Sequence, residues 1–419
     1  MKTLLKNATL WDTARGWRRN DLLLDGQHIS AEGRLSGQRA DQVIDLSGHT
    51  LLPGFIDAHV HIALDDGPFD DQALLGWAKN GVAAVRDCAM LSGLSVPDFM
   101  RWQAEHQQTD WPLVVNTGKY IDVPGGYGSE LPPGHRIGLL VSTPEEAAAA
   151  VDYLRENGCT QLKIALDDSP SPFHPAPRAH NLTPALIRAI CGRARDHGMK
   201  VTAHVLAAKH LRTLVDCGIS DAGHTPTDPI PQDVLKEMIR QGIPMVTTAV
   251  GPVEDHTPGL KPKRPGPPPP PPEAAEQMAR QKEAATRDAL DNLRRFHALG
   301  GTILLGTDLM FSNNYDTCAC IPVLEMEALR SVGIPTEDIL SAGTSSPAKA
   351  LGLEEQLGSL EPGKLACVVA VGGTLSGGFE PLLRPALVIH RGTVLANRMK
   401  ASALAASRRM RTIPGLLRN

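Results

Sequence analysis

Apolar residues in the middle of this chain fall into short runs typical of buried strands, with longer helix-like stretches between them. Thr143-Pro144 and Thr183-Pro184 both have the pattern of a helix start, a capping side chain followed by proline. Eight strand–helix repeats predict a TIM-type (β/α)8 barrel over residues 55–356. An open doubly wound sheet is the alternative, but no Gly-x-Gly-x-x-Gly follows an early strand. The predicted strands are Leu51–Ile62, Ala83–Asp87, Leu113–Thr117, Gln161–Ala165, Lys200–His204, Ser220–His224, Pro244–Thr248 and Thr302–Asp308.

The two ends of the chain have a different pattern. Residues 1–54 and 357–397 consist of short strand-like runs separated by glycine-containing turns. Neither stretch contains the long helices of the central region. We therefore predict that both ends build one small composite β-sandwich domain.

Two further segments stand apart from these domains. Residues 251–272 carry six consecutive prolines, Pro267–Pro272, which favour polyproline II and cannot enter a helix interior or a sheet ladder. This Pro-rich loop is either a stiff surface linker or a lid over the barrel mouth. Residues 398–419 form a basic tail, which we expect to be a solvated helix or a contact in a homo-oligomer.

Composition and charge exclude several classes of protein. The 419 residues are 42% hydrophobic and 21% charged, with a formal net charge of -4, so neither nucleic acid nor a membrane is expected as a partner. The N-terminus lacks the apolar core of a signal peptide, and no stretch resembles a membrane span. Seven scattered cysteines suit a reducing compartment. We expect a cytoplasmic protein that acts on a small molecule.

The candidate chemistry lies at the carboxyl ends of the predicted strands. His59 and His61 alternate with Val60, so both imidazoles point to the same side of the first strand. Strands of a TIM-type barrel deliver catalytic groups to one face, and nitrogen and oxygen donors gathered there suit zinc or a similar metal. Each residue alone has an ordinary structural explanation, but all six together predict a metal site. The candidate ligands are His59, His61, Lys163, His204, His224 and Asp308.

Lys163 poses a separate chemical problem. A protonated ammonium cannot ligate a metal, and its burial beside divalent cations is unfavourable. The side chain is therefore either neutral or converted by carbon dioxide into an anionic carbamate able to bridge two metals. The residues alone leave both states open.

With these residues in place, the chain resembles the metal-dependent amidohydrolase superfamily, in its imidazolonepropionase-like and prolidase-like branch. The resemblance spans nearly the whole chain and is specific for the superfamily, but much less so for the substrate. Besides Lys163 and His204, it is carried by Pro53-Gly-Phe-Ile-Asp-Ala-His-Val-His61, Gly81-Val-Ala-Ala-Val-Arg-Asp87, Gly223-His224, Gly306-Thr-Asp308, Ser346-Pro-Ala-Lys-Ala-Leu-Gly352 and Gly358-Ser-Leu-Glu-Pro-Gly-Lys364.

The resemblance implies a site with two divalent metal ions, expected to be Zn²⁺. It implies that His59, His61 and Asp308 hold one ion and that His204 and His224 hold the other. An N6-carboxylated Lys163 would bridge the two ions together with a hydroxide. Asp308 would be the catalytic residue that takes a proton from this hydroxide and passes it to the leaving group.

The expected reaction is hydrolysis of a C–N bond in an amide or peptide-like small molecule, such as a dipeptide, an N-acyl amino acid or an amide xenobiotic. The close alternative is hydrolysis of lactones and other esters, carbamates or phosphotriesters at the same site. A second alternative is a scaffold protein that keeps the fold without hydrolytic activity. A single-metal deaminase is disfavoured, because such relatives carry glutamate where this chain has Ala207 and lack the lysine corresponding to Lys163. Candidate substrate contacts are Tyr127, Arg178 and His180. Cys318-Ala-Cys320 lacks partner cysteines, and we expect no metal there.

Overall fold

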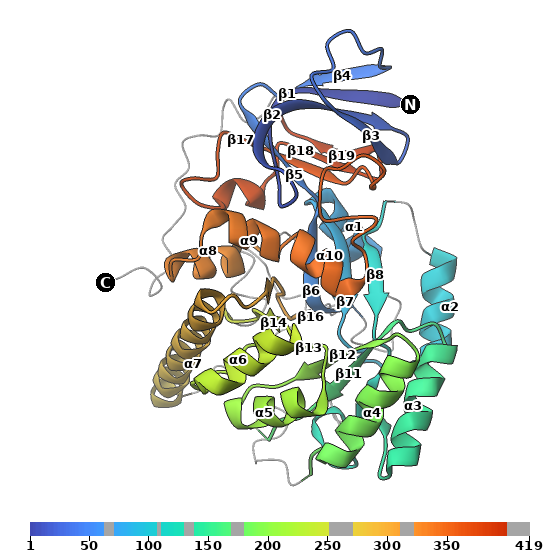
Figure 1. Cartoon of the computed structure of the whole chain (residues 1–419), viewed down its shortest axis with the longest axis vertical. Coiled ribbons are helices and arrows are strands. Elements are labelled where there is room, and N and C mark those ends of the chain that lie inside the picture. Colours follow the sequence, from blue (N-terminus) through green and yellow to red (C-terminus); the bar gives the residue numbers. More distant parts are fainter. Residues whose placement is uncertain are drawn as a thin grey trace.

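Strands form where the sequence has short apolar runs, and they close into the predicted barrel (Figure 1). The computed structural model describes residues 1–62, 71–106, 110–129, 138–168, 180–250, 271–310 and 322–399. Each of the eight predicted runs overlaps a barrel strand, and a further short strand follows the third run and the eighth run. The barrel strands are β6 (Phe55–His61), β7 (Val82–Asp87), β8 (Leu113–Asn116), β9 (Tyr120–Asp122), β11 (Gln161–Ala165), β12 (Lys200–His204), β13 (Asp221–Ala222), β14 (Met245–Val246), β15 (Ile303–Leu304) and β16 (Leu309–Met310).

The strands pair in parallel in two sheets. One has the order β16-β6-β7-β8, and the other β10-β9-β11-β12-β13-β14-β15, where β10 is Gly138–Leu140. Backbone hydrogen bonds close the barrel between its eighth and first strands. Ala58 donates to the carbonyl of Leu305 at 2.9 Å, and Asp308 donates to that of His59 at 2.8 Å. This closure places the ends of the first and eighth strands side by side, which confirms the predicted (β/α)8 barrel.

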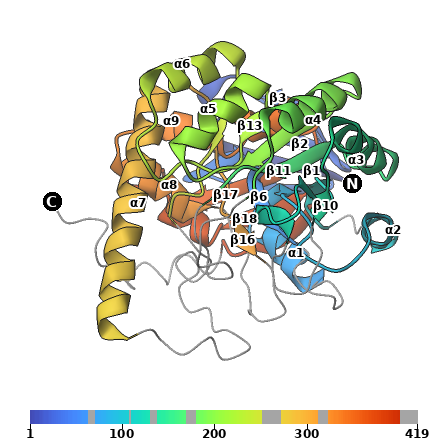
Figure 2. The same ribbon diagram turned by 90° about the horizontal axis from the view of Figure 1, so that it is seen from below.

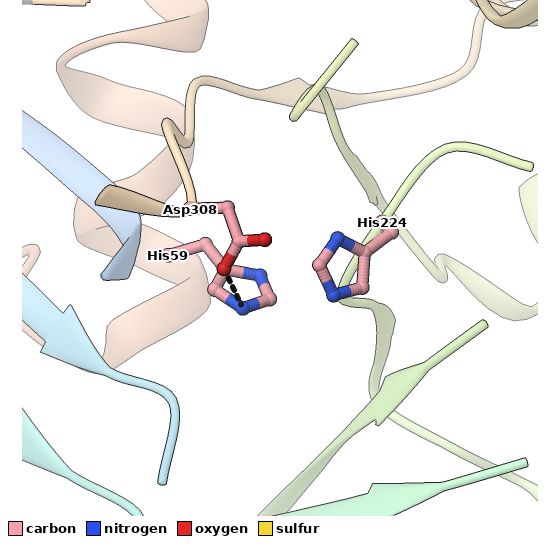
Figure 3. Close-up of side chains that lie close together, drawn as sticks. All are labelled: His59, His224 and Asp308. Carbon is pink, nitrogen blue, oxygen red and sulfur yellow. Dashed lines mark ion pairs between the residues drawn. The ribbon is translucent and has the colours of Figure 1, made fainter. Parts of the chain in front are cut away.

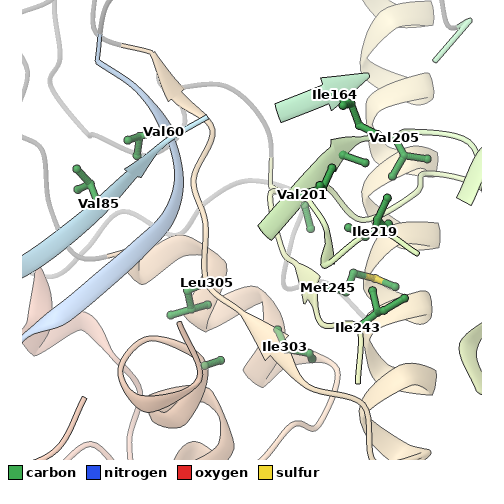
Figure 4. Packing of buried hydrophobic residues seen from close by; sticks show 14 of the residues in the cluster. Val60, Val85, Ile164, Val201, Val205, Ile219, Ile243, Met245, Ile303 and Leu305 are labelled. Carbon is green, nitrogen blue, oxygen red and sulfur yellow. The ribbon is translucent and has the colours of Figure 1, made fainter. Parts of the chain in front are cut away.

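Helices surround the strands and cover their outward-facing apolar side chains (Figures 1 and 2). Val60, Val201 and Met245 belong to this buried layer, part of which Figure 4 shows. Thr143 and Thr183 cap their helices as predicted, accepting hydrogen bonds from the backbone of Glu146 and Leu186. The helices are α1 (Asp71–Lys79), α2 (Val96–His106), α3 (Pro144–Glu156), α4 (Pro184–Asp196), α5 (Ala208–Cys217), α6 (Gln232–Gln241), α7 (Pro272–Ala298), α8 (Val323–Ser331), α9 (Thr336–Ala342) and α10 (Ser345–Leu351), with short 3₁₀ turns η1 (Tyr127–Ser129) and η3 (Glu380–Leu383).

Both ends of the chain build the predicted β domain, at the top of Figure 1. The central pairing is antiparallel, between β5 and β17, and brings residues 49–53 against 368–372. All eight strands belong to one hydrogen-bonded sheet, because β1 pairs with β2, β4 and β5. Side chains from both ends of the chain, among them Leu22, Val368 and Leu387, share one buried cluster in this domain. Its strands are β1 (Lys2–Asp12), β2 (Gly16–Asp25), β3 (His28–Gly33), β4 (Gln42–Asp45), β5 (His49–Pro53), β17 (Val368–Gly372), β18 (Leu387–His390) and β19 (Thr393–Asn397).

Gly54 joins the β domain to the barrel. It separates β5 from β6, and its N–H donates to the carbonyl of Cys367 at 2.8 Å. A Cβ at this position would lie 2.7 Å from the Cβ of Ala83, so only glycine fits without a shift. The junction fixes the direction in which β6 enters the barrel.

Most of two predicted segments falls outside the described residues. Positions 251–270 of the Pro-rich loop and 400–419 of the basic tail belong to this set, and the lid and the oligomer contact stay predictions. Within the described parts of the chain, none of the helices combines the length and the hydropathy needed to cross a membrane.

Candidate metal centre

The six predicted ligands come together at the carboxyl ends of the barrel strands. Ligand atoms of His59, His224 and Asp308 all lie within 4.8 Å of one another (Figure 3). His59 and His61 end β6, and Asp308 lies between β15 and β16. The remaining three come from neighbouring strands: Lys163 from β11, His204 from the end of β12 and His224 from just after β13.

Short contacts connect these side chains. Asp308 Oδ1 lies 3.5 Å from His59 Nε2 and 3.3 Å from His61 Nε2. Lys163 Nζ lies 3.3 Å from the same His59 nitrogen. The ring of His224 lies 4.3 Å from that of His59 and 4.4 Å from that of His204, centroid to centroid. The arrangement is one continuous cluster of nitrogen and oxygen donors.

Each of the four imidazoles has one nitrogen held by a neighbouring group. Nδ1 of His59 donates to the carbonyl of Gly223 at 2.6 Å, and Nδ1 of His61 to that of Ala89 at 2.9 Å. A carbonyl only accepts, so both rings keep a lone pair on Nε2, facing Asp308.

The other two histidines are held in the same way. His204 Nε2 lies 3.2 Å from Asp167 Oδ2, and His224 Nδ1 lies 2.9 Å from Thr248 Oγ1. Each ring therefore has its second nitrogen left for the cluster. A ring held by one nitrogen and offering the other is the usual arrangement of a metal-ligating histidine.

Burial favours the neutral form of three of these rings, those of His59, His204 and His224. It is the largest cause that lowers the pKa of His59 and His224 well below the ordinary value, and Lys163 and adjacent rings lower it further. Burial also lowers the pKa of His204, against the opposing effect of Asp167. Neutral imidazole is the form that binds a metal ion.

Lys163 lies fully buried within this cluster. Burial is the first cause that lowers its pKa, because the interior disfavours the ammonium. A neutral amine is also the form that reacts with carbon dioxide. Together with four imidazoles and a carboxylate, the lysine completes a donor set that fits divalent metal ions.

The backbone is strained and closely packed around the cluster. Three residues there have positive φ without being glycine: Asp308 at +54°, Thr248 at +38° and Ala89 at +110°. Such conformations persist only when the surrounding structure enforces them, and they concentrate at functional sites. Gly223 is required for a related reason, since a Cβ there would lie 3.1 Å from Lys163 Nζ and 2.9 Å from a backbone oxygen.

Asp57 supports the site through the backbone rather than through a ligand ring. Its carboxyl group accepts hydrogen bonds from Thr307 Oγ1 at 2.6 Å, from Thr307 N at 3.1 Å and from His59 N at 3.2 Å. It thereby ties the first strand to the turn that carries Asp308. Burial raises the pKa of Asp57 to about 7.

The predicted substrate contacts have different positions. The Tyr127 ring stacks on His204, with 3.9 Å between centroids and 25° between planes, so it borders the cluster. His180 is exposed and lies beside the glycine-rich turn at Gly125. Arg178, Cys318 and Cys320 fall outside the described residues.

Sequence reasoning missed two groups that orient ligands. Asp167 follows β11 by two residues and is fully buried, and Thr248 follows β14 by two. Both residues lie just beyond strands that end at the site, and this position in the sequence could have indicated their role.

Comparison with known proteins agrees with this fold. A model of the Amidohydrolase family matches residues 174–398, more than half of the chain. The chain therefore belongs to this family, which confirms the predicted superfamily and supports a hydrolytic enzyme.

Individual relatives are more distant. An uncharacterised protein of Mycobacterium tuberculosis is 26% identical over 231 residues, which are 52% of this chain and 56% of that protein. The chain thus spans just over half the length of this curated relative. A crystal structure of a Xaa-Pro dipeptidase with bound methionine aligns at a TM-score of 0.72 with 22% identity, covering 94% and 99% of the two chains. The crystal structure of A. niger ochratoxinase aligns at a TM-score of 0.75 with 16% identity, covering 94% of this chain and 96% of that chain. These structures share the fold.

Proposed function

We propose that this chain is a two-metal amidohydrolase that cleaves an amide or peptide-like C–N bond of a small molecule. The observation that carries the proposal is the state of the four imidazoles. Each has one nitrogen held by a neighbouring group and the other left for a cluster that also contains Lys163 and Asp308. Hydrogen-bonded core histidines do not need to converge in this way.

His59, His61 and Asp308 would hold one ion, and His204 and His224 the other. Lys163, carboxylated on Nζ, would be shared between them, and Zn²⁺ suits the nitrogen-rich set. When bound, the ions lower the pKa of a water molecule and polarise the scissile carbonyl.

Asp308 is the residue placed to move the proton. Its side chain is 34% exposed, whereas those of His59 and His61 are 0% and 5% exposed. A carboxylate oxygen of Asp308 takes the proton from the attacking water as the C–O bond forms. It then gives this proton to the leaving nitrogen as the C–N bond breaks, so the catalyst returns to its starting state.

We expect a substrate with a carbonyl and an anionic end. Tyr127 borders the cluster through its stack on His204, and its hydroxyl is a candidate donor to the substrate carbonyl. His180 and Arg178 remain candidates for a substrate carboxylate. Dipeptides are the first compounds to test, because a Xaa-Pro dipeptidase shares the fold. N-acyl amino acids and amide xenobiotics follow.

The test is a substrate panel measured with metal-loaded and chelator-treated enzyme. The panel contains dipeptides, N-acyl amino acids and other amides beside lactones, carbamates, phosphotriesters and aminopurines. We expect turnover of at least one amide, lost on chelation and restored by Zn²⁺. Turnover confined to esters or phosphotriesters would reassign the scissile bond, and deamination of an aminopurine would refute the hydrolysis of amides.

A further inference from the structure

A buried acid near the site binds backbone groups that follow the seventh barrel strand. Glu325 lies in α8 with 1% of its surface exposed. Its Oε2 accepts the N–H of Ala249 at 3.1 Å, and its Oε1 accepts that of Val250 at 2.9 Å. Burial raises the pKa of Glu325 to about 7, while these donors and Thr247 oppose the rise because they favour the ionised form.

The two residues that Glu325 binds come directly after Thr248, which is held in a strained conformation. A β-branched residue at φ +38° is unfavourable by about 1–3 kcal/mol and needs external support. One support comes from the eighth strand, where the carbonyl of Gly306 accepts the N–H of Thr248 at 3.1 Å. Glu325 supplies a second support from α8.

The strained conformation places one atom that matters for the site. Thr248 Oγ1 lies 2.9 Å from Nδ1 of His224 and thereby fixes the rotation of the imidazole. Buried Glu325 is therefore connected to the ring of His224 through a short stretch of backbone and one hydroxyl group.

We propose that Glu325 is a positioning residue for the metal centre, which holds Thr248 so that its hydroxyl orients His224 for metal binding. This inference rests on the proposed function, since it concerns the same site. It explains why a carboxylate is buried here. The two backbone donors bind different oxygens of the carboxylate, and an uncharged amide side chain of this size carries only one acceptor oxygen.

Glutamine at this position is the sharpest substitution. Glu325→Gln keeps the shape but turns an NH₂ group toward one of the two backbone N–H groups, so one donor loses its acceptor. Substitutions that disturb the partners of metal ligands weaken metal binding about 10- to 100-fold. We expect the dissociation constant for Zn²⁺ to rise at least about tenfold in Glu325→Gln.

Asp12 provides a matched control in the β domain. It is also buried, and it accepts the N–H groups of Arg15 at 2.9 Å and Leu360 at 3.0 Å. Asp12→Asn removes an acceptor of backbone N–H groups, and also weakens an ion pair with Arg18, in the other domain. It should lower the melting temperature of the metal-free protein without changing its Zn²⁺ affinity. Equal losses of affinity in Asp12→Asn and Glu325→Gln would overturn the inference, because they would reflect general destabilisation.

A mutant cycle tests the route through the threonine. Thr248→Ala should weaken Zn²⁺ binding. Thr248→Ser keeps the hydroxyl and should bind Zn²⁺ as the wild type does. This comparison holds even if Glu325→Gln folds poorly. In the Thr248→Ala background, Glu325→Gln should add little, since the hydroxyl that it positions is gone. If the double variant lost Zn²⁺ affinity by the product of the two single-variant factors, the proposed route through Thr248 would be overturned.

Competition with a chelating dye gives the Zn²⁺ affinity without any substrate. If the wild-type chain binds no Zn²⁺ even after reconstitution, the proposed function itself fails. If the wild type binds Zn²⁺ and Glu325→Gln binds it equally well, only the positioning role fails.

Discussion

Gly306 lies where the eighth barrel strand passes against the first and the seventh. A Cβ at this position would meet the side chain of Val246 and would lie 2.9 Å from the Cβ of His59. Both neighbours are fully buried. The His59 ring is also fixed by its 2.6 Å hydrogen bond to the carbonyl of Gly223. Gly306→Ala therefore has to displace His59 or separate two strands.

The structure gives the size of this effect. Carbon atoms pack at about 3.5–4.0 Å, so His59 would have to move by at least about half an ångström. Forcing one extra carbon into a packed core destabilises by about 1–3 kcal/mol. Gly192 in α4 is the matched control, because a Cβ there meets nothing within 4 Å. Gly192→Ala should stabilise the protein by about 0.5–1 kcal/mol, since alanine is the better helix former.

Urea unfolding of the metal-free proteins, followed by far-ultraviolet circular dichroism, measures both changes in the free energy of unfolding. Metal content after reconstitution reports on the displacement of His59. We expect Gly306→Ala to lose stability and to retain less metal, and Gly192→Ala to gain stability with unchanged metal content. If Gly306→Ala matched the wild type in both properties, the packing described around the first ligand would be wrong.

Three other predictions address separate parts of the account. Asp308→Asn should fold normally but lose about 10²- to 10⁴-fold in kcat with an amide substrate, because it cannot take a proton; near-normal turnover would exclude the proposed shuttle. Reconstitution in buffer free of carbon dioxide should leave less bound metal than reconstitution with bicarbonate, if Lys163 must become a carbamate; equal metal contents would argue for a neutral amine. Burial lowers the pKa of His390 to about 4, whereas the pKa of histidine in the unfolded chain is near 6.5. The neutral His390 therefore contributes fully to stability above pH 6.5, and this contribution is lost as the pH falls toward 4. Between pH 7 and 4.5 the wild type should lose roughly 2 kcal/mol more unfolding free energy than His390→Gln in urea titrations, and parallel losses would contradict this assignment.

The barrel could be predicted from the sequence because buried parallel strands are short and largely apolar. Gln161–Ala165 and Lys200–His204 are strands with the predicted bounds. Because strand ends meet on one face, their polar residues were predicted to converge, and ligand atoms of His59, His224 and Asp308 lie together. The topology of the β domain was less accessible, because nothing local shows that β1 pairs with three strands.

The groups that orient the ligands were not predictable in the same way. Glu325 resembles an ordinary surface acid in the helical stretch Val323–Ser331, and only the tertiary structure reveals its contacts with Ala249 and Val250. The carbonyl of Gly223 carries no mark in the sequence, yet it determines which nitrogen of His59 faces the site. Such partners depend on tertiary contacts between segments far apart in the chain.

The central claim is that this cluster holds two divalent ions, and metal content per chain tests it most directly. The protein should be purified without chelators and measured by inductively coupled plasma mass spectrometry, before and after reconstitution with Zn²⁺ and bicarbonate. The account predicts close to two ions per chain. One ion per chain would contradict the two-metal site and reopen a single-metal mechanism, and none after reconstitution would contradict the metal centre itself.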